Sequence, residues 1–192
     1  MHDAGTRWAR CASGLTPECA TPQPPHLPLT DTLPCVIDIE ASGFGCGSYP
    51  IEIGYVLPDG RSHCMLVRPA PPWTHWDAGA EKLHGITQQT LLAHGRPAAE
   101  VASLLNHDLA HLTVYCDGWA HDYGWLATLF DAADAQPVFR LESVTALLSE
   151  EALSRLDAAQ RHVRAEMGLS RHRASNDARA LQRALARVAA GG

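Results

Sequence analysis

The sequence lacks an excess of positive charge, because 15 Lys and Arg residues stand against 21 Asp and Glu residues and leave a formal net charge of −6. A protein that coats nucleic acid without specificity normally presents a large basic surface, so this class of function is disfavoured. A small nucleic-acid site in which metal ions offset phosphate charge is still compatible with the balance. From Glu150 onward, eight Arg residues stand against five acidic residues. A solvated helix face explains this pattern more simply than guidance of a polyanion.

The sequence also lacks the usual markers of disulfide scaffolds, zinc sites and membrane spans. Its six Cys residues include no C-x-x-C pair, and its eleven His residues include no H-E-x-x-H pattern. These absences favour a reducing, cytoplasmic location. No apolar run approaches the ~20 residues of a membrane span. The N-terminus shows no basic segment followed by an apolar one, so no secretory signal is expected.

The length of 192 residues and the hydrophobic content of 46% are typical of one globular domain with a sizeable core. Residues 1–30 are Pro-rich and aperiodic, so we interpret them as a flexible leader. The domain would then occupy residues 31–192.

The order of strand and helix patterns predicts an α/β fold with a central mixed sheet flanked by helices. The first strand is predicted in LPCVIDIEASGFG (33–45), followed by a hairpin that turns at Pro58-Asp59-Gly60. We expect irregular chain at 70–85 and a short helix capped by Thr87. Further strands are predicted near 112–116 and 137–143. Further helices are predicted at 96–111, 121–133, 149–166 and 175–189.

Two carboxylates occupy a strand that is otherwise apolar. Asp38 and Glu40 are two residues apart, so their side chains point to the same face of the sheet, while Val36, Ile37 and Ile39 are their neighbours. Two adjacent anions at the edge of a core repel each other and resist desolvation. A solvated strand face explains the pair as well as a site where protonation, a basic partner or a divalent cation compensates the charge.

Two further carboxylates are predicted in the first turns of helices, namely Asp122 and Asp177. A favourable interaction with the helix dipole would explain each of them alone, and Asp117 is an alternative to Asp122. All of them can converge at one edge of an α/β sheet, where the ligand sites of open sheets lie. Oxygen ligands without Cys suit Mg²⁺ or Mn²⁺, and two such ions are the arrangement for attack on a phosphodiester.

Five short segments resemble, in order along the chain, the motifs of the DEDD exonuclease superfamily. This superfamily comprises the DnaQ-like 3′–5′ exonucleases, which include RNase T and oligoribonuclease. The three main motifs are DIEASG (38–43), HDYGWL (121–126) and HRASNDA (172–178). The two secondary segments are PIEIGYVL (50–57) and KLHGIT (82–87). The resemblance covers roughly residues 33–188 and implies an RNase H-like fold.

The resemblance implies a metal-dependent 3′–5′ exonuclease that acts on single-stranded or short RNA or DNA and releases 5′-mononucleotides. Two Mg²⁺ or Mn²⁺ ions would be held by Asp38, Glu40, Asp122 and Asp177. His172 would be the general base that takes a proton from the attacking water, which an imidazole can do near neutral pH.

The resemblance also implies a set of substrate-binding residues, namely Ser42, Gly43, Phe44, His84, Trp119 and Tyr123. Phe44 would be an apolar wedge at the terminal nucleotide, and the aromatic residues near Asp122 could stack on bases. Core packing would explain Phe44 equally well, and a structural turn would explain His84.

The chain departs from the family pattern at a few positions. The second motif usually has Asn four residues before its Asp and Phe just before it, whereas this chain has Gly118 and His121. Ser42 replaces the usual Thr. The tyrosine subclass has Tyr where this chain has Arg173, so the chain resembles the His subclass, DEDDh. Since no metal ligand is lost, we expect an active enzyme.

Two other functions remain open. The chain could be a non-catalytic nucleic-acid-binding protein on the same fold, or a proofreading subunit within a polymerase assembly. Some relatives are homodimers, so a homodimer is an expectation from the resemblance alone. The sequence does not distinguish RNA from DNA, because the residues that would read a 2′-OH cannot be identified in it.

Overall fold

The centre of the molecule is a mixed five-stranded sheet with the strand order β3-β2-β1-β4-β5. The computed structural model describes residues 33–190, so the predicted leader at 1–30 lies outside the described residues. The strands are β1 (Cys35–Ala41), β2 (Pro50–Val56), β3 (Ser62–Leu66), β4 (Thr113–Cys116) and β5 (Arg140–Ser143). β1 pairs antiparallel with β2 and parallel with β4, while β2–β3 is antiparallel and β4–β5 is parallel. The predicted α/β fold with a mixed sheet is therefore confirmed.

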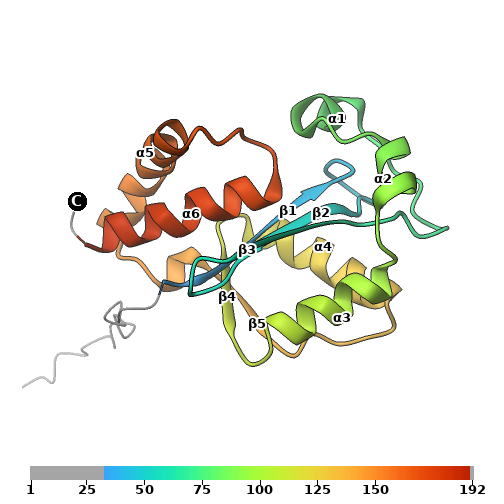
Figure 1. Ribbon diagram of the computed structural model, residues 1–192, viewed down its shortest axis with the longest axis horizontal. Coiled ribbons are helices and arrows are strands. Elements are labelled where there is room, and N and C mark those ends of the chain that lie inside the picture. The colour runs from blue at the N-terminus through green and yellow to red at the C-terminus, as the bar shows by residue number, and fades with distance from the viewer. Residues whose placement is uncertain (1–32, 191–192) are drawn as a thin grey trace, which may run out of the picture.

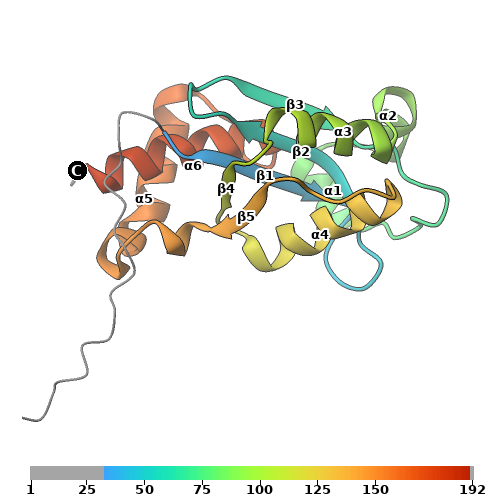
Figure 2. The ribbon, with the colours of Figure 1, turned by 90° about the horizontal axis from the view of Figure 1, so that it is seen from below.

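Helices cover both faces of this sheet. They are α1 (Ala78–His84), α2 (Gln88–His94), α3 (Ala98–Asp108), α4 (Trp119–Ala132), α5 (Glu150–Met167) and α6 (Ala174–Ala189), with a 3₁₀ turn, η1 (Val144–Ala146). Figure 1 shows α5 and α6 on one face and α3 and α4 on the other, and Figure 2 shows the second face from below. Within residues 33–190, no helix is both long and apolar enough to cross a membrane.

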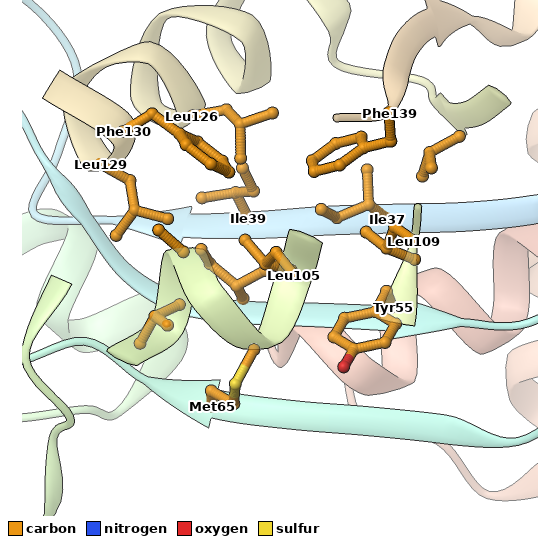
Figure 3. Close-up of a cluster of buried hydrophobic side chains, with 14 of the residues drawn as sticks. Ile37, Ile39, Tyr55, Met65, Leu105, Leu109, Leu126, Leu129, Phe130 and Phe139 are labelled. Atoms are coloured by element: carbon orange, nitrogen blue, oxygen red, sulfur yellow. The ribbon is translucent and has the colours of Figure 1, made fainter. Parts of the chain in front are cut away.

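Strand β1 separates two layers of core because its side chains alternate between the faces. Ile37 and Ile39 are buried against α3 and α4, where Figure 3 shows Leu105, Leu126 and neighbouring side chains around them. Val36 belongs to the other layer, beneath α5 and α6. Asp38 and Glu40 share the face of Val36, so they lie on the α5–α6 side of the sheet.

Helix α6 approaches the sheet closely at Gly54, which pairs with Asp38 across β1 and β2. A Cβ atom added at Gly54 would lie 2.2 Å from backbone atoms of Ala174 and Ser175, closer than real contacts allow. Because glycine has no side chain, the first turn of α6 can contact β2 directly. This contact places Asp177 next to β1.

Helix α1 contradicts the prediction of irregular chain at 70–85. The Asp77 side chain caps the helix by accepting a hydrogen bond from the N–H of Gly79, and Gly85 ends it with φ of 69°. His84 is the one buried residue of this seven-residue helix. The helix was missed because so short an element with one buried side chain has no apolar periodicity. The prediction that Thr87 caps a following helix is confirmed, since its side chain accepts from the N–H of Thr90.

Candidate active site

Strand β1 and helix α6 bring three of the predicted ligands together. Asp38, Glu40 and Asp177 each offer a carboxylate oxygen, and these three oxygens all lie within 4.8 Å of one another. The two β1 residues share a face of the sheet, and Asp177 is in the first turn of α6. The arrangement therefore joins residues that are more than a hundred positions apart in the sequence.

The fourth predicted ligand, Asp122, comes from the first turn of α4, just after β4. Its side chain is buried, with 4% of its surface exposed. Asp122 lies outside the group of three oxygens but lines the same cavity. Asp117, the alternative ligand, also lines this cavity, and its Oδ2 accepts a hydrogen bond of 2.9 Å from Gln160.

The cavity has a volume of about 520 Å³, which is within the usual range of small-molecule sites. All five residues that the resemblance marks as catalytic line it, including His172. It is formed by the end of β1, the first turns of α4 and α6, and one side of α5. The cavity thus lies where the ligand sites of open α/β sheets are found.

The carboxyl groups in this cavity are held in an unfavourable environment. Burial raises the pKa of Asp38 well above its ordinary value, and the charges of Asp122, Glu40 and Asp177 add to this effect. Burial and the charge of Asp177 raise the pKa of Glu40 to about 7. Burial also raises the pKa of Asp122 to about 7, although a hydrogen bond with Cys116 opposes it. Such a cluster takes up protons or cations. An all-carboxylate donor set fits a hard divalent ion such as Mg²⁺ or Mn²⁺.

A neighbouring carboxylate, Glu52, has a different environment. It pairs with Glu40 across β1 and β2 and is fully buried. Arg173 donates to it from Nη2 at 2.7 Å, and the backbone N–H of Ala174 donates at 2.8 Å. Burial would raise the pKa of Glu52, but these hydrogen bonds outweigh it and hold the pKa below its ordinary value. Glu52 therefore anchors the start of α6 to β2.

His172 lies in the connection between α5 and α6 and adopts a left-handed conformation, with φ of 59°. Its backbone N–H donates to Oδ2 of Asp177 at 2.7 Å, and that of Arg173 donates to the same oxygen at 3.3 Å. These bonds fix the loop relative to the carboxylate. A non-glycine residue in this region is uncommon and is found more often at functional sites.

The predicted substrate-binding residues divide into two groups. Gly43, Phe44 and His84 line the cavity. Ser42 is buried behind it, where its Oγ accepts from the N–H of Tyr49 at 3.1 Å and lies 3.0 Å from Nδ1 of His75. Trp119 and Tyr123 lie on the exposed side of α4, stacked on each other with ring centroids 5.3 Å apart. They are not among the residues that line the cavity.

Three aromatic side chains, those of Phe44, His121 and Trp125, form one wall of the cavity. The ring of Phe44 lies 5.0 Å from that of His121 and 5.8 Å from that of Trp125. Phe44 and Leu83 are 65% and 62% exposed, so two large apolar side chains face solvent at the mouth. Exposed apolar groups that gather around a polar pocket are typical of a ligand site.

Sequence reasoning missed the wall that α5 contributes, which includes Leu156, Gln160 and Arg164. A signal was present in the pattern of α5. Its buried positions are Ala152, Leu156, Gln160 and Val163, so a polar amide interrupts an otherwise apolar stripe. A buried amide needs hydrogen-bond partners, and Gln160 has them in Asp117 and Arg164.

Comparison with known proteins finds similar solved structures, at low sequence identity. No protein-family model and no curated protein matches the chain. E. coli Exonuclease I in complex with a dA16 oligonucleotide has a TM-score of 0.59 and 17% identity, covering 80% of this chain and 40% of that chain. A moderately thermophilic Exonuclease I from Methylocaldum szegediense has a TM-score of 0.58 and 16% identity, with coverages of 80% and 39%. The zinc-bound E. coli ExoI–ssDNA complex has a TM-score of 0.56 and 16% identity, with coverages of 80% and 38%.

This likeness confirms the predicted RNase H-like exonuclease fold. The chain spans about 40% of the length of these structures.

Proposed function

We propose that residues 31–192 form a DEDD-type exonuclease domain of the His subclass. It would remove 5′-mononucleotides from the 3′ end of single-stranded or short RNA or DNA in a metal-dependent reaction. The observation that carries this proposal is the convergence of Asp38, Glu40 and Asp177 within 4.8 Å, inside one cavity.

The comparisons support the same class of function. The similar structures are exonucleases, and two of them are described as complexes with a dA16 oligonucleotide and with single-stranded DNA. A shared fold leaves the chemistry to the site. The carboxylates and His172 therefore carry the argument beyond the fold.

Asp38, Glu40, Asp122 and Asp177 would hold two Mg²⁺ or Mn²⁺ ions. These ions would polarise the phosphodiester, lower the pKa of the attacking water and offset charge on the leaving 3′ oxygen. The carboxylates fit this task because burial, with their mutual repulsion added to it, raises the pKa of Asp38 and Glu40, and a bound cation relieves both effects.

His172 would act as the general base. Its loop is fixed to Asp177 through the backbone, so His172, which lines the cavity, is kept near the carboxylate cluster. An imidazole that is neutral near physiological pH can take the proton of an attacking water.

The wall formed by Phe44, His121 and Trp125 would receive the base of the terminal nucleotide. Aromatic rings stack on any base, so this wall would give little preference for sequence. The exposed pair of Trp119 and Tyr123 would contact a nucleotide farther along the strand, since it lies outside the cavity.

The test uses 5′-labelled single-stranded RNA and DNA oligomers, incubated with the full chain in Mg²⁺, in Mn²⁺ or in EDTA. We expect a ladder that shortens from the 3′ end, depends on the metal and is absent in Asp38→Ala. The faster of the two substrates would identify the preferred nucleic acid.

Cleavage that persists in EDTA or in Asp38→Ala would contradict the proposal. Stable binding of the oligomers without cleavage, in the presence of metal, would instead indicate a non-catalytic binding protein.

A further inference from the structure

Helix α5 places the positively charged side chain of Arg164 in the acidic cavity. The guanidinium group of Arg164 donates to Oδ1 of Asp177 from both Nε, at 3.0 Å, and Nη2, at 2.7 Å. Both side chains of this ion pair are only 13% exposed. Nη2 also donates to Gln160, one turn earlier on α5, at 3.0 Å. Among residues 33–190, this is the one ion pair that involves a member of the Asp38–Glu40–Asp177 cluster.

The two carboxylate oxygens of Asp177 accept hydrogen bonds from different parts of the chain. Oδ2 accepts the backbone N–H groups of His172 and Arg173, which cannot leave without unfolding the start of α6. Oδ1 accepts two N–H groups from Arg164, and a carboxylate oxygen has two lone pairs for such bonds. A side chain can rotate away, whereas the loop backbone cannot. The oxygen that Asp177 can offer to a metal ion is therefore the one that Arg164 occupies.

We propose that Arg164 is an internal counter-ion that takes the metal-facing oxygen of Asp177 in the metal-free protein, so that a divalent cation must displace it. The inference rests on the proposed function, because it assumes that the cluster binds a metal ion. Arg164 relieves part of the repulsion among the carboxylates while no metal is bound. Gln160 keeps the guanidinium in place through the same helix.

The role of Arg164 has two measurable consequences. Metal affinity is lower than the carboxylates alone would give, because the ion competes with two charge-assisted hydrogen bonds. The metal-free protein is more stable than it would be without Arg164, since otherwise Asp177 would lie unpaired beside two other carboxylates.

The experiment measures Mn²⁺ binding to the full chain by electron paramagnetic resonance of the free ion. It compares the wild type with Arg164→Gln, Arg164→Lys and the control Arg171→Gln. Arg171 also lines the cavity, and among the described residues no ion pair joins it to Asp177. The control therefore removes a nearby positive charge without removing the contact.

We expect the Kd for Mn²⁺ to fall by about tenfold or more in Arg164→Gln, the effect of losing hydrogen bonds to a charged group. Arg171→Gln should change it by less than about threefold, as a solvent-screened charge would. Arg164→Lys, which keeps the charge but loses the fork of donors, should lie between the wild type and Arg164→Gln.

Melting temperatures provide a second readout. We expect Arg164→Gln to melt at a lower temperature than the wild type in EDTA, and this difference to shrink in saturating Mn²⁺. An equal loss of melting temperature in both conditions would show that Arg164 serves packing alone and would overturn the inference.

The binding outcomes separate the inference from the proposed function. If all variants bind Mn²⁺ with the same Kd, or if Arg164→Gln binds it more weakly, the counter-ion role is wrong although a metal site exists. If neither the wild type nor any variant binds Mn²⁺, both the metal site and the counter-ion role are wrong.

Discussion

Glu40 and Glu52 pair with each other across β1 and β2, yet their carboxylates have opposite environments. Glu52 is fully buried and is neutralised by Arg173 and the N–H of Ala174, so its pKa is lowered. Glu40 lies in the cavity near Asp38 and Asp177, where burial and repulsion raise its pKa to about 7. Burial alone therefore does not mark a functional carboxylate. The informative difference is whether the protein itself supplies the compensating positive charge.

Asp38 and Asp177 repeat this contrast inside the cavity. Asp38 has no ion-pair partner among residues 33–190, whereas Asp177 has Arg164. The first is compensated by protonation or by an added cation, and the second partly by the chain. The carboxylates of this site therefore differ in how much of their negative charge the protein itself compensates.

The largest expected effect is the loss of turnover in Asp38→Asn. We expect exonuclease activity to fall below detection, because an amide is a poor ligand for a divalent ion. We also expect a higher melting temperature than the wild type in EDTA, since a repulsive charge is removed. Asp177→Asn should lose activity as well but should gain no stability, because it leaves Arg164 unpaired.

Both melting temperatures are measured with and without Mn²⁺. Wild-type turnover in Asp38→Asn would show that Asp38 is not a metal ligand.

The next effect in size concerns His172. We expect His172→Ala to lower the rate by about 10²- to 10⁴-fold, the usual contribution of a general base, with Mn²⁺ binding largely preserved. Single-turnover kinetics beside a Mn²⁺ titration would check this. Unchanged kinetics would assign the base to another residue, and lost Mn²⁺ binding would mean that the loop acts through the position of Asp177.

A direct way to sharpen the comparison is to replace each of the paired glutamates by glutamine. Glu52→Gln should lower the free energy of unfolding by about 1–3 kcal/mol, less than for a fully buried ion pair because Arg173 is 47% exposed. Glu40→Gln should be neutral or stabilising in EDTA. Thermal and urea unfolding measure both. Equal destabilisation by the two substitutions would remove the distinction between them.

The last effect is gradual, because it is a dependence of stability on pH. A carboxyl group whose pKa is raised on folding keeps its proton in the folded protein at pH values where the unfolded chain has released it. The free energy of unfolding of the metal-free protein should therefore fall as pH rises from about 4.5 towards 7, by about 1.4 kcal/mol per pH unit for each such group. The groups are Asp38, whose pKa is raised well above its ordinary value, and Glu40 and Asp122, each with a pKa raised to about 7.

Urea unfolding in EDTA across this range checks the slope. The double variant Glu40→Gln, Asp122→Asn should reduce the slope, and Asp38 should account for what remains. An unchanged slope in the double variant would mean that other groups cause the dependence.

Much of the fold follows from the sequence pattern, because the apolar strand at 35–41 and the amphipathic helix at 174–189 have clear periodicity. The sequence predicted that Asp177 and Asp38 can converge at one edge of the sheet, but it did not indicate how closely they approach, since this depends on the contact of Ala174 with Gly54. Arg164 was missed for a similar reason. Its role depends on how α5 packs against α6, and a helical arginine is usually solvated.

The assignments of metal ligands and general base stay predictions. Their placement around one cavity is an observation of the structure.

The most direct test of the central claim is a crystal structure of the protein soaked in Mn²⁺, with anomalous diffraction used to locate the ion. We predict anomalous density bounded by Asp38, Glu40 and Asp177, with none at the anchored Glu52. Density elsewhere, or an empty cluster at a Mn²⁺ concentration that supports turnover, would contradict the claim that the uncompensated carboxylates form the metal site.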